Sequence, residues 1–322
     1  MGSYFSSTQT VDIPNTEIPL SNPKSLTQFS VLTYNILANS YSSYMNHCPK
    51  KYLNFDYRSS LIFKQIQDIN ADFVCLQEVD KYENYFKPFL KKHGYKSHWK
   101  KRPSSWSPDG SLIAWKEDIW ELVEIKEIDF NEESMNRRNS AYRKNNIGII
   151  IVFKHKETNS GIIIGTAHFY WDPDLEYVKF FQGTVFKTIG FTIKSKYSLP
   201  IILCGDFNCM PESKTIKYLT NQEIELNPGV EIDNEILSIP KPQEFVLKSA
   251  YACYNQEGYP KFTNYTPDFK ECIDYIMYSE GVNVEELGKV LDLEDLRGVC
   301  GLPNEKYPSD HLPLAARFSG SD

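Results

Sequence analysis

The chain has 322 residues, about twice the commonest domain size, and 35 Lys and Arg residues against 42 Asp and Glu residues give it a formal net charge of −7. Hydrophobic residues make up 41% and charged residues 24%, which excludes a mostly disordered or collagen-like polymer, and the length excludes a disulfide-stapled mini-protein. Because the chain as a whole is acidic, any nucleic acid must be bound through a local patch.

The seven cysteines stand singly, with no CxxC pair, which argues against a zinc ribbon and favours a reducing compartment. No apolar run approaches the roughly 20 residues needed to span a bilayer. We therefore expect a cytoplasmic protein, without excluding the nucleus. The first residues, MGSYFS, fit the short pattern for myristoylation of Gly2, which would add a weak membrane anchor, and they fit a plain disordered start better.

Residues 1–27 lack periodicity and are rich in Ser, Thr, Pro and Asn, so we expect a flexible leader and then one domain over 28–322. Apolar residues spaced three and four apart predict helices over 59–70 and 174–196, and the polar stretch 221–243 is expected to be an insertion. Short, mostly continuous apolar runs predict eight buried strands, at 29–37, 73–77, 111–115, 147–153, 162–168, 201–206, 273–278 and 314–318.

Polar side chains stand in these strands or directly beside their ends, where a hydrophobic core has no use for them. They are Asn35, Glu78, His168, Asp206, Asn208, Asp274, Asp310 and His311. Taken singly, each is more often a cap or turn residue than a functional one. Charges beside buried strands cost several kcal/mol unless they are paired or bind a metal, so the whole set predicts a site if the residues converge.

Three of these residues are candidate metal ligands. Oxygen ligands without a Cys or His cluster favour a hard ion such as Mg²⁺, with Mn²⁺ as an acceptable substitute. Glu78 is the best direct ligand, and Asn35 and Asp310 are expected beside it. Asn35 is also counted among the catalytic groups.

The other polar residues suit the metal-assisted cleavage of a phosphodiester bond. Asp206 could orient or deprotonate a water molecule, and Asn208 could donate its amide to a phosphate oxygen. His168 and His311 could donate to the phosphate in the same way, as neutral or charged imidazoles. Asp274 could hold His311 in the right tautomer, as a carboxylate does in many His-dependent sites.

Five ordered motifs carry a resemblance to a known family. They are TYNIL at 33–37, LQEV at 76–79, GDFN at 205–208, IDY at 273–275 and SDH at 309–311. In this order the set resembles the endonuclease/exonuclease/phosphatase superfamily, over nearly the whole chain from 29 to 318. The resemblance implies an α/β fold like that of deoxyribonuclease I, a four-layer sandwich of two packed mixed β-sheets flanked by helices, with 28–322 as the catalytic domain.

Three further segments, AHFYWDP at 167–173, KFTNYTPDF at 261–269 and DGSLIAWK at 109–116, resemble the carbon-catabolite-repressor-type poly(A) deadenylases. In that family a proline and a phenylalanine grip an adenine, which would correspond to Pro173 and Phe269, and Asn264 is a candidate to read the base edge. No leucine-rich repeats precede residue 29, so the chain looks like the nuclease domain alone, as in the relatives nocturnin, Angel and the 2′-phosphodiesterase.

The resemblance implies a Mg²⁺-dependent 3′-to-5′ exoribonuclease that prefers poly(A) and releases AMP, with RNA as its partner. The same chemistry on 2′,5′-oligoadenylate, a nicotinamide dinucleotide phosphate or a phospholipid head group is an alternative. A catalytically silent RNA-binding module is another, and the intact set of polar residues argues against it.

A basic stretch over 91–102 contrasts with the acidic total charge. It fits equally well a solvated helix end and turn or a patch that steers phosphate towards the site.

Overall fold

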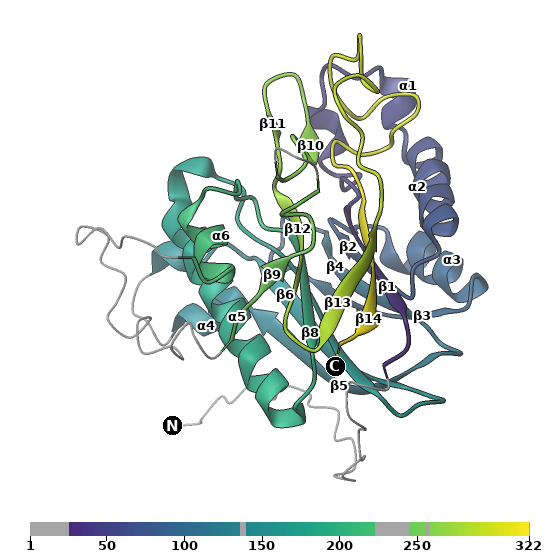
Figure 1. Ribbon diagram of the computed structural model, residues 1–322. Helices are drawn as coiled ribbons and strands as arrows, with labels where there is room; N and C mark the ends of the chain where they lie inside the picture. Colours follow the sequence, from purple (N-terminus) through teal and green to yellow (C-terminus); the bar gives the residue numbers. More distant parts are fainter. Residues whose placement is uncertain (1–25, 136–139, 223–244, 255–257, 322) are drawn as a thin grey trace, which may run out of the picture.

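Two sheets pack face to face in the computed structural model of the chain, which describes residues 26–135, 140–222, 245–254 and 258–321. Helices cover the outer face of each sheet, so the described residues form four layers, in the order helix, sheet, sheet, helix (Figure 1). The predicted four-layer α/β sandwich is therefore confirmed.

The first sheet has six strands in the order β13-β14-β1-β2-β4-β3. It is mixed, because β1 pairs in parallel with β2 and antiparallel with β14. Its strands are β1 (Phe29–Asn35), β2 (Phe73–Gln77), β3 (Tyr95–Lys101), β4 (Gly110–Lys116), β13 (Val282–Leu287) and β14 (Leu314–Gly320).

The second sheet also has six strands, in the order β5-β6-β7-β8-β12-β9, and is mixed because β8 pairs in parallel with β7 and antiparallel with β12. Its strands are β5 (Trp120–Asp129), β6 (Ile147–His155), β7 (Gly161–His168), β8 (Ile201–Asp206), β9 (Lys248–Ser249) and β12 (Asp274–Tyr278). A separate two-stranded ribbon consists of β10 (Asn264–Tyr265) and β11 (Lys270–Glu271).

The helices divide between the two outer faces. On the first sheet these are α2 (Phe55–Ile69), which follows α1 (Lys50–Leu53), and α3 (Lys87–Lys92). On the second sheet they are α4 (Phe130–Met135), α5 (Glu176–Tyr197) and α6 (Lys214–Leu219). Short helical turns are formed by Ser42–Tyr44, Tyr82–Phe86, Ser140–Tyr142 and Pro173–Leu175.

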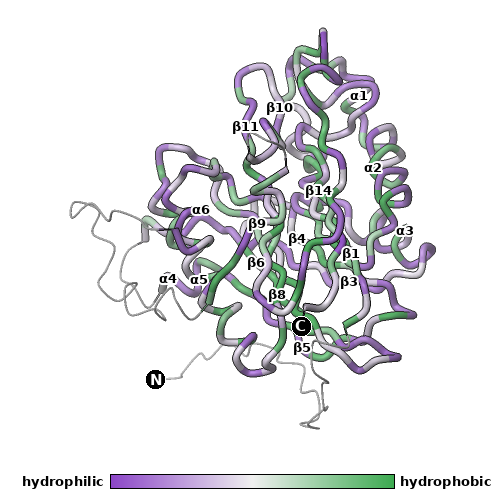
Figure 2. Tube along the Cα trace, in the orientation of Figure 1, coloured by the Kyte–Doolittle hydropathy of each residue, from purple (hydrophilic) through white to green (hydrophobic). Residues whose placement is uncertain are grey.

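Successive side chains of a strand point to opposite faces of its sheet, and this produces three apolar layers, one between the sheets and one under the helices on each outer face. In β1, Val31 points between the sheets and Leu32 points outwards towards α2, whose Ile62 and Ile66 are fully or almost fully buried against it. Figure 2 shows the result, with hydrophobic strands in the interior and mixed hydropathy along the helices that cover them.

All eight predicted strands are present within two residues at each end, and the two predicted helices correspond to α2 and α5. The sequence interpretation missed β3, β5 and β13, whose burial patterns show a solvent face in place of a continuous apolar run. The basic stretch is thus the end of α3 followed by the edge strand β3, which differs from the helix end and turn that were one of its two interpretations.

Parts of the expected organisation fall outside the described residues, namely Gly2, residues 1–25 of the leader and most of the 221–243 stretch. Leu26, the first described residue, is buried in the core between the sheets. All seven cysteines are free thiols. Among the described residues, no helix has both the length and the apolar composition to cross a membrane.

Candidate active site

Strand pairing brings the polar residues at the strand ends together. In the parallel pair β7 and β8, His168 lies opposite Asp206, and in the antiparallel pair β8 and β12, Asp274 lies opposite Asp206 from the other side. In the first sheet, Asn35 ends β1 beside Gln77 at the end of β2, and Glu78 follows directly. The ends of parallel strands meet at one edge, so both sheets deliver polar side chains to the same place.

The GDFN segment depends on a glycine for its close packing. Gly205 has φ 140°, and a Cβ at this position would lie 2.0 Å from the carbonyl oxygen of Ala167 on β7. Only glycine allows β8 to approach β7 so closely next to Asp206.

Asp206 is the centre of the site. Its Oδ2 lies 3.0 Å from Nδ2 of Asn35, 3.5 Å from Nε2 of His168 and 3.6 Å from Nε2 of His311, and its Oδ1 accepts from the backbone N–H of Asn208 at 2.9 Å. Burial raises the pKa of this carboxyl to about 7, with His311 opposing the rise and Asp274 adding to it. A carboxylate with a pKa near neutrality can exchange a proton with water at working pH.

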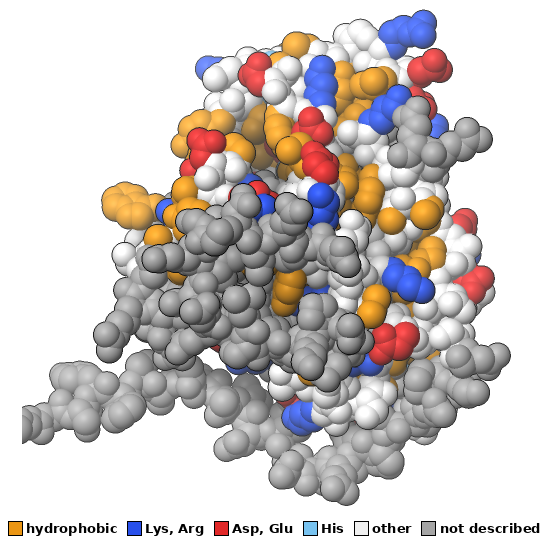
Figure 3. Space-filling view, turned by 60° about the vertical axis from the view of Figure 1, so that its left-hand side comes forward, with side chains coloured by type: hydrophobic (Ala, Val, Ile, Leu, Met, Phe, Trp, Pro, Cys, Tyr) orange, Lys and Arg blue, Asp and Glu red, His pale blue; other side chains and the backbone are white. Residues whose placement is uncertain are grey.

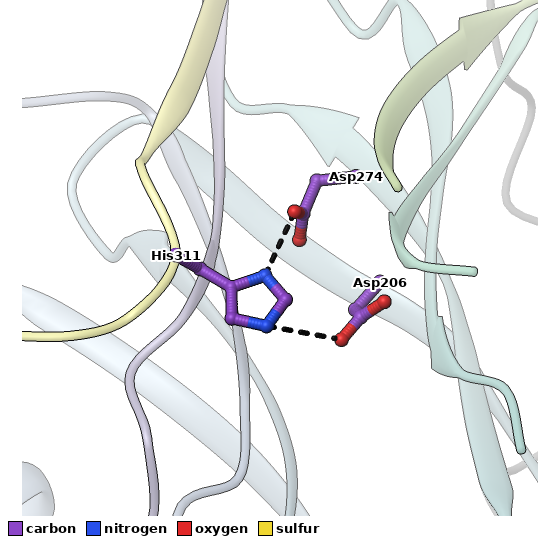
Figure 4. A group of neighbouring side chains, drawn as sticks. All are labelled: Asp206, Asp274 and His311. Carbon is purple, nitrogen blue, oxygen red and sulfur yellow. Dashed lines mark hydrogen bonds and ion pairs between the residues drawn. The ribbon is translucent and has the colours of Figure 1, made fainter. Parts of the chain in front are cut away.

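His311 is held between two carboxylates (Figure 4). Its Nδ1 lies 2.8 Å from Oδ2 of Asp274, and its Nε2 faces Asp206. Burial alone would lower the pKa of His311, but Asp274, Asp206 and Asp310 raise it well above the ordinary value. These carboxylates therefore favour the charged form of His311, with a proton on each nitrogen.

His168 faces the same oxygen of Asp206 with a different partner behind it. Its Nδ1 lies 2.8 Å from Nη2 of Arg102, and Nε of Arg102 donates to Oδ2 of Asp109 at 2.8 Å. Burial, then Arg102 and then His311, lower the pKa of His168 well below its ordinary value. His168 is therefore neutral.

Glu78 lies in the left-handed region with φ 60°, a conformation that costs energy for a residue other than glycine and that occurs most often at functional sites. Its Oε1 accepts from Nδ2 of Asn35 at 3.1 Å and its Oε2 from the backbone N–H of Ala38 at 2.9 Å. Burial, followed by repulsion from Asp310 and Asp109, raises the pKa of Glu78 to about 7.

The donor set of Glu78 and Asp310 fits a hard divalent ion, because two carboxylates that destabilise each other's charge gain most from a cation between them. Asp310 is buried, and its Oδ2 accepts from Nδ2 of Asn264 at 3.2 Å. The amide oxygen of Asn35 accepts from the backbone N–H of Leu37 at 3.1 Å, which leaves one lone pair for an ion.

A second group could hold a metal by distance alone, since Asp206, Asp274 and His311 offer ligand atoms within 4.8 Å of one another. The carboxylates on both sides of His311 favour its charged form, which has no lone pair for a metal, and its contacts with Asp274 and Asp206 are those of a hydrogen-bonded triad. The repulsion of Asp310 on Glu78, which a cation would relieve, favours these two acids as the metal-holding pair.

Helix α5 supports the two loops that flank the site. Lys179 is buried and its Nζ donates to the carbonyl of Asn208 at 3.0 Å, while Nδ2 of Asn208 donates to the carbonyl of Phe169 at 3.0 Å. Nε2 of Gln182 donates to Oδ1 of Asn146 at 3.1 Å, and Nδ2 of Asn146 donates to the carbonyl of His168 at 2.9 Å. One hydrogen of the Asn208 amide therefore remains for a substrate.

The residues of the expected adenine slot are near the surface. Pro173 is exposed at the start of a helical turn, and Phe269 is 41% exposed in the turn between β10 and β11. Figure 3 shows hydrophobic side chains scattered among charged ones on the side of the molecule that lies to the left in Figure 1. Asn264 is buried and holds Asp310, so its contacts favour orienting that carboxylate over reading a base edge.

The structure brings all eight polar residues of the strand ends together. Seven are linked through Asn35, Asp206 and His311, and Asp310 is reached through the hydroxyl of Ser309, which lies 2.7 Å from the carbonyl of Asn35 and 3.4 Å from Oδ1 of Asp310. The sequence interpretation gave no site role to Arg58, and it included Arg102 and Asp109 only as parts of the basic stretch and of the Asp–Gly segment. Arg58 is fully buried, and its Nη1 donates to the carbonyls of Ile36 and Pro308 at 3.0 and 3.1 Å. A buried arginine within the amphipathic pattern of α2 was the signal that could have identified it.

Comparison with known proteins identifies similar chains. A sequence model described as "Endonuclease/Exonuclease/phosphatase family" matches residues 32–311. The "CCR4-Not complex 3'-5'-exoribonuclease subunit Ccr4" of Kluyveromyces lactis is 32% identical over 90% of this chain and 41% of its own length. The chain spans between about 40 and 65% of the length of four such relatives, so it corresponds to one part of them.

Solved structures agree with this. A structure of ANGEL2, described as a 2',3'-cyclic phosphatase in complex with adenosine-2',3'-vanadate, has a TM-score of 0.78 and 27% identity, covering 91% of this chain and 96% of that one. The human Nocturnin catalytic domain with bound sulfate has a TM-score of 0.70 and 24% identity, covering 92% and 94%. At 24% identity the second likeness concerns the fold alone.

Proposed function

Since this chain belongs to the endonuclease/exonuclease/phosphatase family, we propose that it is a Mg²⁺-dependent 3′-to-5′ exoribonuclease that removes AMP from poly(A). The observation that carries the proposal is the position of Asp206, whose Oδ2 is faced at 3.5 and 3.6 Å by two histidines. Relatives named as 3'-5'-exoribonucleases, about 32% identical over 90% of this chain, support the reaction direction.

The gap between the histidines and Asp206 suits a phosphate group. Distances of 3.5 and 3.6 Å are too long for hydrogen bonds, so both Nε2–H groups are available to a phosphate oxygen placed beside Asp206. One donor is neutral and the other is cationic, which stabilises the negative charge that builds up during in-line displacement. Asp206 accepts the proton of the attacking water, a role that its pKa of about 7 permits.

Glu78 and Asp310, with Asn35 beside them, are the residues that would hold Mg²⁺. A bound Mg²⁺ would neutralise charge on the phosphate and support the leaving oxygen. Asn208 adds a donor to a nonbridging oxygen with the free hydrogen of its amide, and the contact of Lys179 with its carbonyl keeps that amide in place.

Poly(A) preference is proposed from the slot of Pro173 and Phe269. An aromatic face opposed to a proline ring accepts a flat purine, and stacking contributes about 1–3 kcal/mol for each base. The proposed partner is therefore RNA. Seven free thiols fit a reducing compartment, and we place the activity in the cytoplasm.

The test is a panel of labelled RNAs with A, U and C tails, together with 2′,5′-oligoadenylate and NADPH, incubated with the purified protein and Mg²⁺ or Mn²⁺. We expect stepwise release of AMP from the A-tailed RNA. Glu78→Ala abolishes this release, whereas Glu157→Ala, an exposed acid between β6 and β7, leaves it unchanged. Near-normal turnover of Glu78→Ala at modest Mg²⁺ would move the metal role elsewhere.

Base choice needs its own comparison. Phe269→Ala weakens binding of every tail, by about 1–3 kcal/mol and most for purines, because stacking tolerates any base. Asn264→Ala, which also removes a donor to Asp310, tests base-edge reading against metal-site support. No A-over-U preference in the wild type, or a preference that survives both changes, would overturn the adenine slot.

A second candidate activity is removal of a 2′,3′-cyclic phosphate from an RNA end. The likeness to ANGEL2, at 27% identity over 91% of this chain, favours it. The same panel decides between the two activities when it includes an RNA with a 2′,3′-cyclic phosphate, because opening the ring leaves the RNA length unchanged whereas an exonuclease shortens it.

A further inference from the structure

We propose that Arg102 and Asp109 form a positioning pair that fixes His168 in the tautomer with its proton on Nε2, facing Asp206. The inference rests on the proposed function of the site and adds two residues that act through His168. Neither residue is among the eight polar residues named from the sequence.

The contact of Arg102 with His168 decides the tautomer. Nη2 of Arg102 lies 2.8 Å from Nδ1 of His168. A guanidinium is always charged and can only donate, so Nδ1 must accept with its lone pair. The single proton of the neutral ring is then on Nε2, the atom that lies 3.5 Å from Oδ2 of Asp206.

Asp109 prevents the guanidinium from turning away. Nε of Arg102 donates to Oδ2 of Asp109 at 2.8 Å, and the hydroxyl of Tyr41 donates to Oδ1 at 2.7 Å. The backbone N–H of Arg102 also donates to the carbonyl of Asp109 at 3.0 Å, which closes the loop between β3 and β4. The side chain of Asp109 is 1% exposed and that of Arg102 is 11% exposed, so water competes little for these bonds.

The ring of His168 is fixed from its own strand as well. Its carbonyl accepts from Nδ2 of Asn146 at 2.9 Å, and the next residue, Phe169, donates its N–H to the carbonyl of Asp206 at 2.9 Å. With the backbone held, the remaining freedom of the side chain is ring rotation and tautomer, and Arg102 removes both. Without Arg102, the proton could move to Nδ1 and leave Nε2 as an acceptor that repels a phosphate oxygen.

The kinetic test compares Arg102→Met with the wild type on the A-tailed RNA at saturating Mg²⁺. We expect kcat to fall about 10- to 100-fold with little change in KM, because the substrate does not touch the altered residue. Arg317→Met, at an exposed arginine that pairs with Glu286, is the matched control and leaves both constants unchanged. Arg102→Lys restores part of kcat, since a lysine donates but lacks the fork that also reaches Asp109.

A double-mutant cycle separates this role from direct substrate contact. In a His168→Gln background, Arg102→Met causes no further loss of kcat if Arg102 acts through His168. An additive loss, or a loss confined to KM, would overturn the proposal in favour of a contact between Arg102 and the substrate phosphate.

A spectroscopic test does not depend on any activity. In ¹⁵N-histidine-labelled protein, His168, assigned from the signal missing in His168→Gln, shows a protonated Nε2 and an unprotonated Nδ1. Arg102→Met and Asp109→Asn shift this signal towards a mixture of tautomers. A fixed Nε2–H tautomer in folded Arg102→Met would overturn the proposal, and failure of the RNA panel with the wild type would overturn the proposed function alone.

Discussion

His168 and His311 reach the same oxygen of Asp206 in almost the same way and carry different charges. Their Nε2 atoms lie 3.5 and 3.6 Å from Oδ2 of Asp206, and their side chains are 8% and 6% exposed. Arg102 stands behind the first ring and Asp274 behind the second. Burial lowers the pKa of both rings, so it does not explain why they differ, and the difference follows from the charge of the partner on Nδ1.

Each of the two pairs also connects one sheet to the other. His168 ends β7 of the second sheet and meets Arg102, which follows β3 of the first. His311 precedes β14 of the first sheet and meets Asp274 of β12 in the second. The charges of the site therefore depend on how the sheets pack, because neither histidine receives its partner from its own sheet.

Asp206→Asn is expected to have the largest effect, because it removes the carboxylate that both histidines face. We expect the hydrolysis rate to fall by about 10³-fold or more, since the proton acceptor and the counter-charge of His311 are lost together. Single-turnover kinetics with the A-tailed RNA measure the loss. The exposed Asp118→Asn is the control, and a loss of less than about tenfold in Asp206→Asn would place the proton acceptor elsewhere.

Asp274→Asn changes a direct contact of His311 and leaves the direct contacts of His168 unchanged. Asp274 contributes most to raising the pKa of His311, against the lowering effect of burial, so its removal brings this pKa down. The imidazolium is then lost as pH rises through the neutral range. We expect a loss of about 10²-fold at pH 8 that shrinks towards pH 6, when rates are taken relative to wild type at each pH. A pH-independent ratio would mean that the charge of His311 is not used.

The regions that the sequence predicts well are those whose environment is local. The eight predicted strands, such as those at 201–206 and 73–77, are apolar along their length because both faces are covered, and a continuous apolar run records this directly. Edge strands such as β5 have one solvent face and interleaved charges, so the same criterion overlooked them.

The residues of the site also differ in whether their environment is visible in the local sequence. Asp206, Glu78 and Asn35 could be predicted because they stand at the ends of buried apolar strands, where a hydrophobic core has no use for a polar side chain. Arg102 could not be assigned a role, because its contact with His168 joins residues 66 positions apart on different sheets. The Asp–Gly segment at 109–110 was noticed only as a resemblance, since nothing in the sequence shows that Asp109 holds Arg102.

In the absence of metal, the acids that would hold it are expected to lower the stability of the folded chain. The folded pKa of Glu78, about 7, lies above its ordinary value of 4.5, so the folded state binds a proton more tightly than the unfolded state does. The free energy of unfolding therefore falls as pH rises from 4.5 to 7, in the absence of metal.

Glu78→Gln removes this penalty. With a chelator at pH 8, we expect its free energy of unfolding to exceed that of wild type by about 3 kcal/mol, and to equal it near pH 4.5. Saturating Mg²⁺ reverses the order, because only the wild type gains from binding. Urea denaturation measures both differences, with Glu157→Gln as control, and an unchanged order in Mg²⁺ would contradict the metal role of Glu78.

The smallest expected effect tests whether the cationic side of the site extends along β3. Lys96 and Lys100 are already paired, with Glu117 at 2.7 Å and Glu127 at 2.9 Å, whereas Lys101 is exposed at the end of the strand beside Arg102. One phosphate contact on a single strand contributes about 0.7 to the slope of affinity against salt on logarithmic scales. Between about 50 and 200 mM salt, the kcat/KM of wild type should therefore fall about threefold more than that of Lys101→Ala.

Lys96→Ala is the matched control for Lys101→Ala, because the charge of Lys96 is already offset by Glu117, the residue that directly follows β4. It should keep the wild-type salt dependence, since an exposed ion pair contributes little field beyond its own partner. Equal slopes for all three proteins would assign the basic stretch to solvation of the sheet edge. A reduced slope for Lys101→Ala alone would mean that the phosphate approaches the site from the side of Arg102. The carboxylates on the side of Asp274 would repel it.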